Sequence, residues 1–104
     1  ALNPANRTAH HRLGLLAMLA REYDTAVAHL QTAHAVTPEY RGIVKPLGYS
    51  YVWLGAYDQA APLLATIPEA QVEMTVYTSW WQDQERPDLA SQATSMVAIL
   101  ENKR

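Results

Sequence analysis

Histidine is the first residue type to test for chemistry in this chain, because imidazole side chains bind metals and transfer protons. His10 and His11 are adjacent, so on a helix they would point about 100° apart and could not both face one metal ion. His29 and His34 are five residues apart, whereas two imidazoles meet on one helix face at a spacing of four. The chain has no cysteine, which excludes disulfides, thiolate catalysis and cysteine-rich zinc sites. We therefore expect no bound metal.

Serine and acidic residues likewise lack a catalytic arrangement. Ser79, Ser91 and Ser95 have no His and Asp at spacings that would build a nucleophilic site. The nearest carboxylates have the pattern of solvated helix ends and turns: Glu69, Glu73, Asp83 and Glu85. The four glycines stand singly, so the chain has no glycine-rich phosphate loop. We expect neither enzyme activity nor a cofactor.

Charge and hydropathy exclude two further classes of partner. The net charge is −2, whereas nucleic-acid binding depends on clustered Lys and Arg. No stretch reaches the ~18 consecutive apolar residues of a membrane span. This composition predicts a soluble domain, either cytoplasmic or attached to a membrane protein, that binds no nucleic acid and does not itself insert into a membrane.

The elements that must position these residues follow from an internal repeat. Six residues return in the same order 34 positions later: Leu13, Gly14, Tyr23, Asp24, Ala26 and Leu30 recur as Leu47, Gly48, Tyr57, Asp58, Ala60 and Leu64. A fixed period of this length is typical of stacked-repeat proteins. Each unit of such a protein buries its apolar face against its neighbours.

Each unit has the pattern of two helices. Apolar residues recur at i, i+3, i+4 and i+7 in a first run, at Leu13, Leu16, Ala17 and Ala20, and again from Ala26 to Ala33. An Asp precedes each second run, where its side chain can accept bonds from the free N–H groups of a helix start. Thr37-Pro38 ends the first unit, because proline restricts the residue before it and cannot extend a helix.

These residues resemble the tetratricopeptide repeat, whose pattern and period are known. The second unit carries the pattern at Leu47, Gly48, Tyr51, Gly55, Tyr57, Ala60 and Leu64. The first unit departs from it at Ala17, where an aromatic residue is usual, and at Arg21, where the turn glycine is usual. The resemblance implies an all-α fold in which antiparallel helix-turn-helix pairs stack as a right-handed superhelix.

The same resemblance divides the chain into repeats within a single domain, residues 1–104. Residues 1–6 look like the end of a preceding repeat, because Pro4 lies 34 residues before Pro38. We expect repeat 1 at 7–40, a shortened repeat 2 at 41–69, and a divergent third helix pair at 70–104. The chain is then expected to be a fragment of a larger protein.

Two residues depart from the pattern in ways that affect packing. Pro46 lies inside the first helix expected for the second unit, which predicts either a kink or delayed start there, or a helix that begins near Val44. Trp80 stands where the pattern usually has a small residue. The third pair must therefore pack differently or leave this ring partly exposed.

A function follows from the resemblance. In tetratricopeptide arrays the first helices of the pairs line a concave groove in which partner peptides lie. Carried onto this sequence, the predicted partner-binding residues are His11, Leu15, Met18, Leu19, Lys45, Tyr49, Val52, Trp53 and Gln82, with Val72, Thr75, Val76 and Ser79 as further groove positions of the third unit. We expect Tyr49 and Trp53, four apart on one helix face, to be exposed in the groove. The chain is thus predicted to be a non-catalytic scaffold for a peptide or protein segment.

Other arrangements remain open. The charged clamp by which some family members hold a terminal carboxylate is absent, since the corresponding positions are His11, Leu15, Pro46, Val72 and Val76. The alternative function is a self-association or spacer module, in which copies join through helix edges. A second, weaker resemblance is to repeat segments at the carboxyl end of bacterial O-antigen ligase or polymerase-like membrane proteins, and it implies a soluble appendage of a polysaccharide-assembly protein. It is carried by Arg41–Ile43, Leu47–Trp53 and the Trp80-Trp81 pair.

Overall fold

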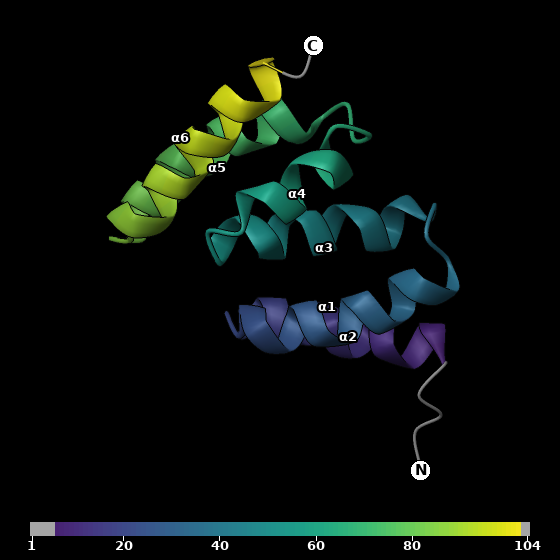
Figure 1. Cartoon of the computed structure of the whole chain (residues 1–104). Coiled ribbons are helices and arrows are strands. Elements are labelled where there is room, and N and C mark those ends of the chain that lie inside the picture. The colour runs from purple at the N-terminus through teal and green to yellow at the C-terminus, as the bar shows by residue number, and fades with distance from the viewer. Residues whose placement is uncertain (1–5, 103–104) are drawn as a thin grey trace.

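The computed structural model describes residues 6–102, and these form three antiparallel helix pairs (Figure 1). The first pair is α1 (Arg7–Leu19) with α2 (Tyr23–Val36), the second is α3 (Arg41–Trp53) with α4 (Tyr57–Leu64), and the third is α5 (Ala70–Asp83) with α6 (Pro87–Asn102). The predicted all-α fold of stacked helix pairs is confirmed. Of the residues assigned to a preceding repeat, 1–5 lie outside the described residues, whereas Asn6 caps α1 by accepting a 3.0 Å bond from the Ala9 N–H.

The same turn joins the two helices of every pair. Its central residue has a left-handed backbone: φ is 60° at Arg21, 76° at Gly55 and 58° at Glu85. In each turn the next N–H bonds back to a carbonyl five residues earlier: Glu22 to Ala17, Ala56 to Tyr51, and Arg86 to Trp81. This hydrogen-bond pattern is a helix-ending motif that usually employs glycine. The third pair therefore closes like the others, although the second pair alone has glycine at this position.

Close contact inside the pairs depends on matched side-chain sizes. A Cβ atom on Gly14 would lie 2.5 Å from Cγ of Leu30, and a Cβ atom on Gly48 would lie 2.5 Å from Cδ2 of Leu64. The corresponding third-pair residues are Thr78 and Thr94, whose hydroxyl oxygens are 3.2 Å apart. Two side chains of middle size thus replace the glycine and leucine of the first two pairs.

Two apolar clusters form the interior. A small one lies in the first pair and includes Ala26, Val27 and Leu30, together with Leu47 from α3. A larger one extends from α3 to α6 and includes Leu64, Met74, Met96 and Leu100. The third pair contacts the second mainly through α6, which lies against α3 and α4. This docking leaves α5 facing α3 across large aromatic side chains.

The helix that contains Pro46 begins earlier than two of the sequence-based alternatives predicted. α3 begins at Arg41 and continues through Pro46, so a helix start delayed to the proline, or placed near Val44, is wrong. Pro46 has no N–H to offer the carbonyl of Gly42, four residues earlier. Gly42 has a separate packing role, because a Cβ atom there would lie 2.8 Å from the Tyr40 ring. α4 contains Pro62 and spans eight residues, against 14 in α2 and 16 in α6. None of the helices within residues 6–102 is long and apolar enough to cross a membrane.

Candidate partner-binding groove

A groove with a volume of about 820 Å³ lies between α1, α3 and α5. Most of its lining side chains are apolar or aromatic, namely Leu15, Met18, Leu19, Tyr23, Tyr40, Pro46, Tyr49, Trp53, Tyr77, Trp80 and Trp81. The others are Arg21, Arg41, Gly42, Lys45 and Glu73. All three first helices of the pairs therefore contribute to one concave surface.

An aromatic cluster forms the wall where α3 meets α5. Tyr77 packs edge-on against Tyr49 and Trp53, with ring centres 5.9 and 5.3 Å apart. Trp53 packs similarly on Trp81 at 5.4 Å, and Trp80 lies against both Tyr77 and Trp81. Edge-to-face pairs at these distances are favourable beyond the area that they bury.

Burial corrects the prediction for three residues of α3. Tyr49 is 4% exposed and Trp53 is 6% exposed, so the expectation of exposed rings is wrong. The reason is that α5 places Tyr77 and Trp81 over them. Their remaining surface still lines the groove, whereas Val52 is fully buried in the core and is not available to a partner.

The remaining predicted residues divide into two groups. Leu15, Met18, Leu19 and Lys45 line the groove as expected from their positions. His11 and Gln82 do not belong to its lining. His11 instead meets the edge of Tyr40, with ring centres 5.9 Å apart. Partner binding by these residues stays a prediction.

The groove face of α5 also differs from the expectation. The predicted positions were Val72, Thr75, Val76 and Ser79, whereas the main groove is lined by Glu73, Tyr77, Trp80 and Trp81. Val76 lines a smaller hollow beside it, which shares Glu73, Tyr77 and Trp80. The third pair docks on the second through α6, and this turns a different face of α5 toward the groove. The equivalent positions of α3 lie in the core. Trp80 is 42% exposed, which confirms that its ring is only partly covered.

Sequence reasoning did not select Arg21, Tyr23 or Glu73 as groove residues. For Arg21 a signal was present, because a large cation replaces the usual turn glycine. Tyr23 and Glu73 carried no such signal, since their place depends on how the pairs dock.

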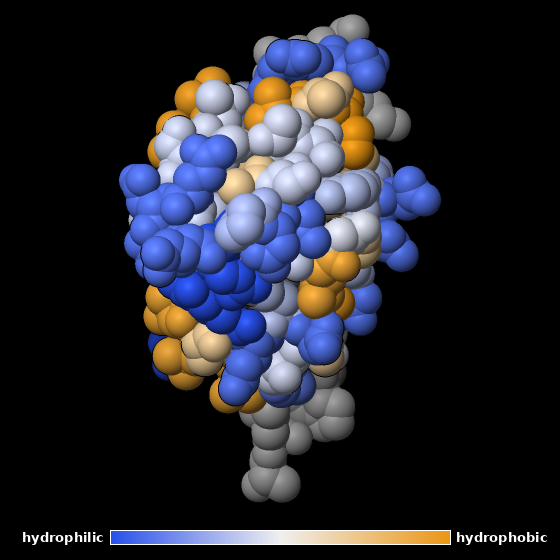
Figure 2. All heavy atoms as spheres, turned by 90° about the vertical axis from the view of Figure 1, so that its left-hand side faces the viewer, coloured by the Kyte–Doolittle hydropathy of each residue, from blue (hydrophilic) through white to orange (hydrophobic). Residues whose placement is uncertain are grey.

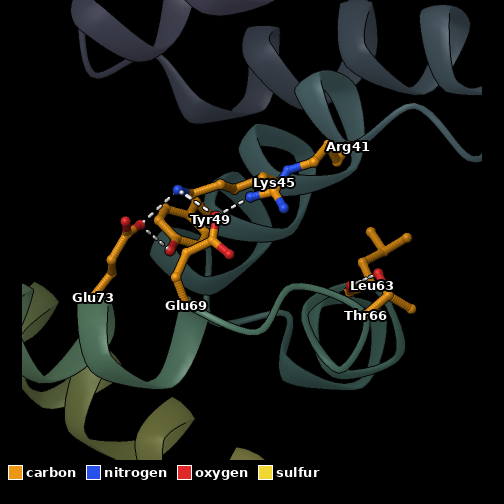
Figure 3. A network of polar contacts seen from close by, with 7 residues as sticks. All are labelled: Arg41, Lys45, Tyr49, Leu63, Thr66, Glu69 and Glu73. Atoms are coloured by element: carbon orange, nitrogen blue, oxygen red, sulfur yellow. Dashed lines mark hydrogen bonds and ion pairs between the residues drawn. The ribbon is translucent and has the colours of Figure 1, made fainter.

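A polar network links α3 to the start of α5 at one side of the groove (Figure 3). Nζ of Lys45 lies 2.8 Å from Oε1 of Glu73 and 3.1 Å from Oε2 of Glu69. Arg41 also pairs with Glu69. The Tyr49 hydroxyl donates a 2.6 Å hydrogen bond to Glu73. Figure 3 shows Glu73 directed at Lys45 and Tyr49 from the neighbouring helix.

The network shifts the ionisation of its members. Burial and the hydrogen bond to Glu73 raise the pKa of Tyr49 well above its usual range. Burial acts to raise the pKa of Glu73, but the bonds from Lys45 and Tyr49 outweigh it and the pKa is lowered. Burial acts to lower the pKa of Lys45, but the bonds to Glu73 and Glu69 outweigh this effect, and the pKa of Lys45 is raised. At neutral pH the ion pairs and the tyrosine hydroxyl are therefore all maintained.

The histidines considered for chemistry are separated by the fold, with one exception. His10 on α1 faces His29 on α2, with their Nδ1 atoms 2.9 Å apart. Nε2 of His10 is buried and has no hydrogen-bond partner among the described residues. No group of three or more potential metal ligands of the types His, Cys, Asp and Glu occurs within residues 6–102.

Comparison with known proteins identifies the repeat. The family model described as "Tetratricopeptide repeat" matches residues 17–75, more than half of the chain. Comparisons with curated proteins and with solved structures return no match. The matched residues include α2, α3 and α4 entire, together with the turns between them. With three stacked helix pairs closed by one shared turn, the chain belongs to the tetratricopeptide repeat family.

Proposed function

We propose that this protein binds a segment of another protein in the groove between α1, α3 and α5, without catalysing a reaction. The observation that carries the proposal is the exposed apolar surface inside one concavity: Leu19 is 82% exposed and Trp80 is 42% exposed. Apolar and aromatic anchors at the centre of a concave surface are typical of binding sites. Family membership supports the broader role of a protein-interaction scaffold.

The size of the groove limits the occupant. Ligand pockets of a few hundred to about 1,000 Å³ hold a small number of side chains. At about 820 Å³ the groove suits a short segment with one or two apolar anchors. The buried rings of Tyr49 and Trp53 then serve as a preformed wall, and the exposed side chains of Leu15, Leu19 and Trp80 make the contacts with the bound segment.

The test is selection of binders from a random dodecapeptide library displayed on phage, using two matched double variants. Leu15→Ala with Leu19→Ala removes apolar side chains from the groove. Leu13→Ala with Leu16→Ala removes the same residue type from the same helix, at exposed positions outside the groove. We expect selected peptides to lose binding to the first variant and keep binding to the second. Equal binding to both would contradict the proposal.

Self-association is a second candidate, favoured by a different surface. Leu16 is 61% exposed and lies with Leu13 on the part of α1 that faces away from the groove lining. Sedimentation of the wild type and of the Leu13→Ala, Leu16→Ala variant tests it: a dimer that this variant abolishes supports the second candidate. The attachment to a polysaccharide-assembly membrane protein, implied by the weaker sequence resemblance, remains a prediction.

A further inference from the structure

Arg21 is a cation that connects the first and third pairs at one end of the groove. It lies in the α1–α2 turn, and Nη2 donates a 3.3 Å hydrogen bond to Oε1 of Gln84, just after α5. Its guanidinium carbon is 5.1 Å from the centre of the Trp81 ring and 5.9 Å from that of Trp80. The three turns inside the pairs lie on the left in Figure 1, and Figure 2 shows that end with a strongly hydrophilic centre bordered by separate hydrophobic patches.

Arg21 differs from the other two cations of the groove. Arg41 and Lys45 are paired with Glu69 and Glu73. The guanidinium of Arg21 forms no ion pair within residues 6–102, and its one hydrogen-bond acceptor there, the Gln84 amide, is neutral. Among the described residues, this positive charge at the end of the groove therefore has no ion-pair partner.

The environment of Arg21 prepares it to bind a carboxylate. Stacking on aromatic rings restricts the guanidinium and removes water from one face, so less freedom is lost when a second partner binds. A guanidinium binds a carboxylate through two parallel N–H bonds, which are stronger than a bond to an amide oxygen. The charge at the groove also favours an acidic partner: Glu69 and Glu73 balance Arg41 and Lys45, and Arg21 adds one further positive charge.

We propose that the segment bound in the groove carries an Asp or Glu side chain beside an apolar anchor. The anchor contacts Leu19 and Trp80, and the carboxylate replaces the Gln84 amide on Arg21. This proposal rests on the proposed function and adds the chemistry of its ligand. It concerns a side-chain carboxylate inside a segment, and Arg21 is the residue that determines the preference.

The experiment compares three proteins in the same dodecapeptide selection: wild type, Arg21→Met and Arg12→Met. Arg12 is the matched control, since it is an exposed cation of α1 outside the groove lining. We expect wild type and Arg12→Met to enrich peptides with an acidic residue next to an apolar one. Arg21→Met, with unchanged helical circular dichroism, should enrich the apolar residue alone.

Fluorescence anisotropy then measures the preference directly. One selected peptide and its isosteric amide version, with Gln for Glu or Asn for Asp, are titrated against the same three proteins and against Arg21→Lys. Wild type should prefer the acidic peptide by roughly ten-fold, as for one charge-assisted contact, and added salt should reduce the ratio. Arg21→Met should bind both peptides equally, and Arg21→Lys should show a smaller preference than wild type.

The outcomes separate the two proposals. Apolar enrichment without acidic residues, or an acidic preference that persists in Arg21→Met, overturns the role of Arg21 and leaves groove binding intact. Failure of every protein to enrich apolar residues overturns groove binding itself, and this inference with it.

Discussion

At the residue scale, the polar network beside the groove joins residues that are distant in the sequence. The family resemblance predicts Lys45 as a groove residue, but its partners Glu69 and Glu73 are 24 and 28 residues further along the chain. These carboxylates had the pattern of solvated helix ends. Their pairing with Lys45 depends on the docking of α5 beside α3, which residue spacing does not describe.

The first prediction concerns pH and Glu73. The folded-state pKa of Glu73 lies below its unfolded value of 4.5, so its ionised form stabilises the folded protein above that pH. This stabilisation is lost as the pH falls through the folded-state pKa. We expect Glu73→Gln to lower the free energy of unfolding by up to about 1 kcal/mol at neutral pH and to have no effect in strongly acidic buffer.

Urea unfolding at a series of pH values measures this difference. Glu101→Gln, at an exposed carboxylate near the end of α6, is the control and should change stability little at any pH. A Glu73→Gln effect that is constant with pH would show that the ion pair is not its origin.

The second prediction concerns the pair formed by His10 and His29. The equivalent residues in the second pair are Val44 and Leu63, so two imidazoles occupy positions that are apolar in the second pair. His29→Leu alone should lower the free energy of unfolding by about 1–3 kcal/mol, because both nitrogens of the buried His10 then lack partners.

Adding His10→Val should recover this loss, since the unpartnered polar group is then removed together with its site. Thermal unfolding of the wild type, the His29→Leu variant and the double variant measures these differences in stability. A double variant less stable than His29→Leu would contradict this account of the pair.

At the element scale, pairing inside each unit depends on side-chain size at one contact. Gly48 and Leu64 are a small and a large residue that fit, and the Thr78 and Thr94 pair shows another solution of the same problem. The glycines were predicted from the repeat pattern. The compensation between Thr78 and Thr94 was not, because each looks like an ordinary departure until the helices are placed side by side.

The third prediction tests this contact. Gly48→Ala should lower the free energy of unfolding by about 1–3 kcal/mol, because its Cβ would overlap the buried Leu64 side chain. In a Leu64→Ala background the same change should raise stability by up to about 1 kcal/mol, since alanine favours the helix over glycine. Urea denaturation of the four proteins measures the coupling, and additive effects would refute it.

The fourth prediction concerns the shared turn. Glu85 has a left-handed backbone, at φ 58°, that costs a residue with a side chain roughly 1 kcal/mol. Glu85→Gly should therefore stabilise the protein by about this amount. Gln84→Gly, one residue earlier with φ −85°, should destabilise it instead. Chemical denaturation of both variants compares them, and a stabilising Gln84→Gly would contradict the argument.

At the scale of the whole molecule, stability is expected to be uneven. The first pair has a small core that includes alanines, whereas one larger cluster joins α3, α4, α5 and α6. Leu13 and Leu16 of α1 are also uncovered. Repeat proteins unfold in units whose stability follows their own contacts and those with neighbours.

The fifth prediction is that α1 and α2 open before the rest of the chain. In native-state hydrogen exchange, the amides of α1 and α2 should exchange with a lower free energy of opening than those of α3 and α6. Leu30→Ala should lower the hydrogen-exchange protection of the first pair more than that of the second or third pair. Equal protection across all helices would show a single cooperative unit.

The sequence by itself determined the parts of this protein that depend on local order. The period of 34 residues, the two apolar runs per unit and the turn residues predicted helices, pairs and family, because each signal is contained within one or two consecutive units of the chain. For α1 and α3 the groove positions Leu15, Met18, Leu19 and Lys45 followed from the resemblance to the tetratricopeptide repeat, and all four line the groove.

Only the tertiary structure decided the docking of the third pair through α6, and with it the face of α5 that lines the groove. It also decided the burial of Tyr49 and Trp53, the pairing of His10 with His29, and the reach of Arg21 to the end of α5. These features depend on the summed volumes and charges of side chains from distant segments. Residue spacing within one helix carries no information about how side chains from distant segments fill space and balance charge together.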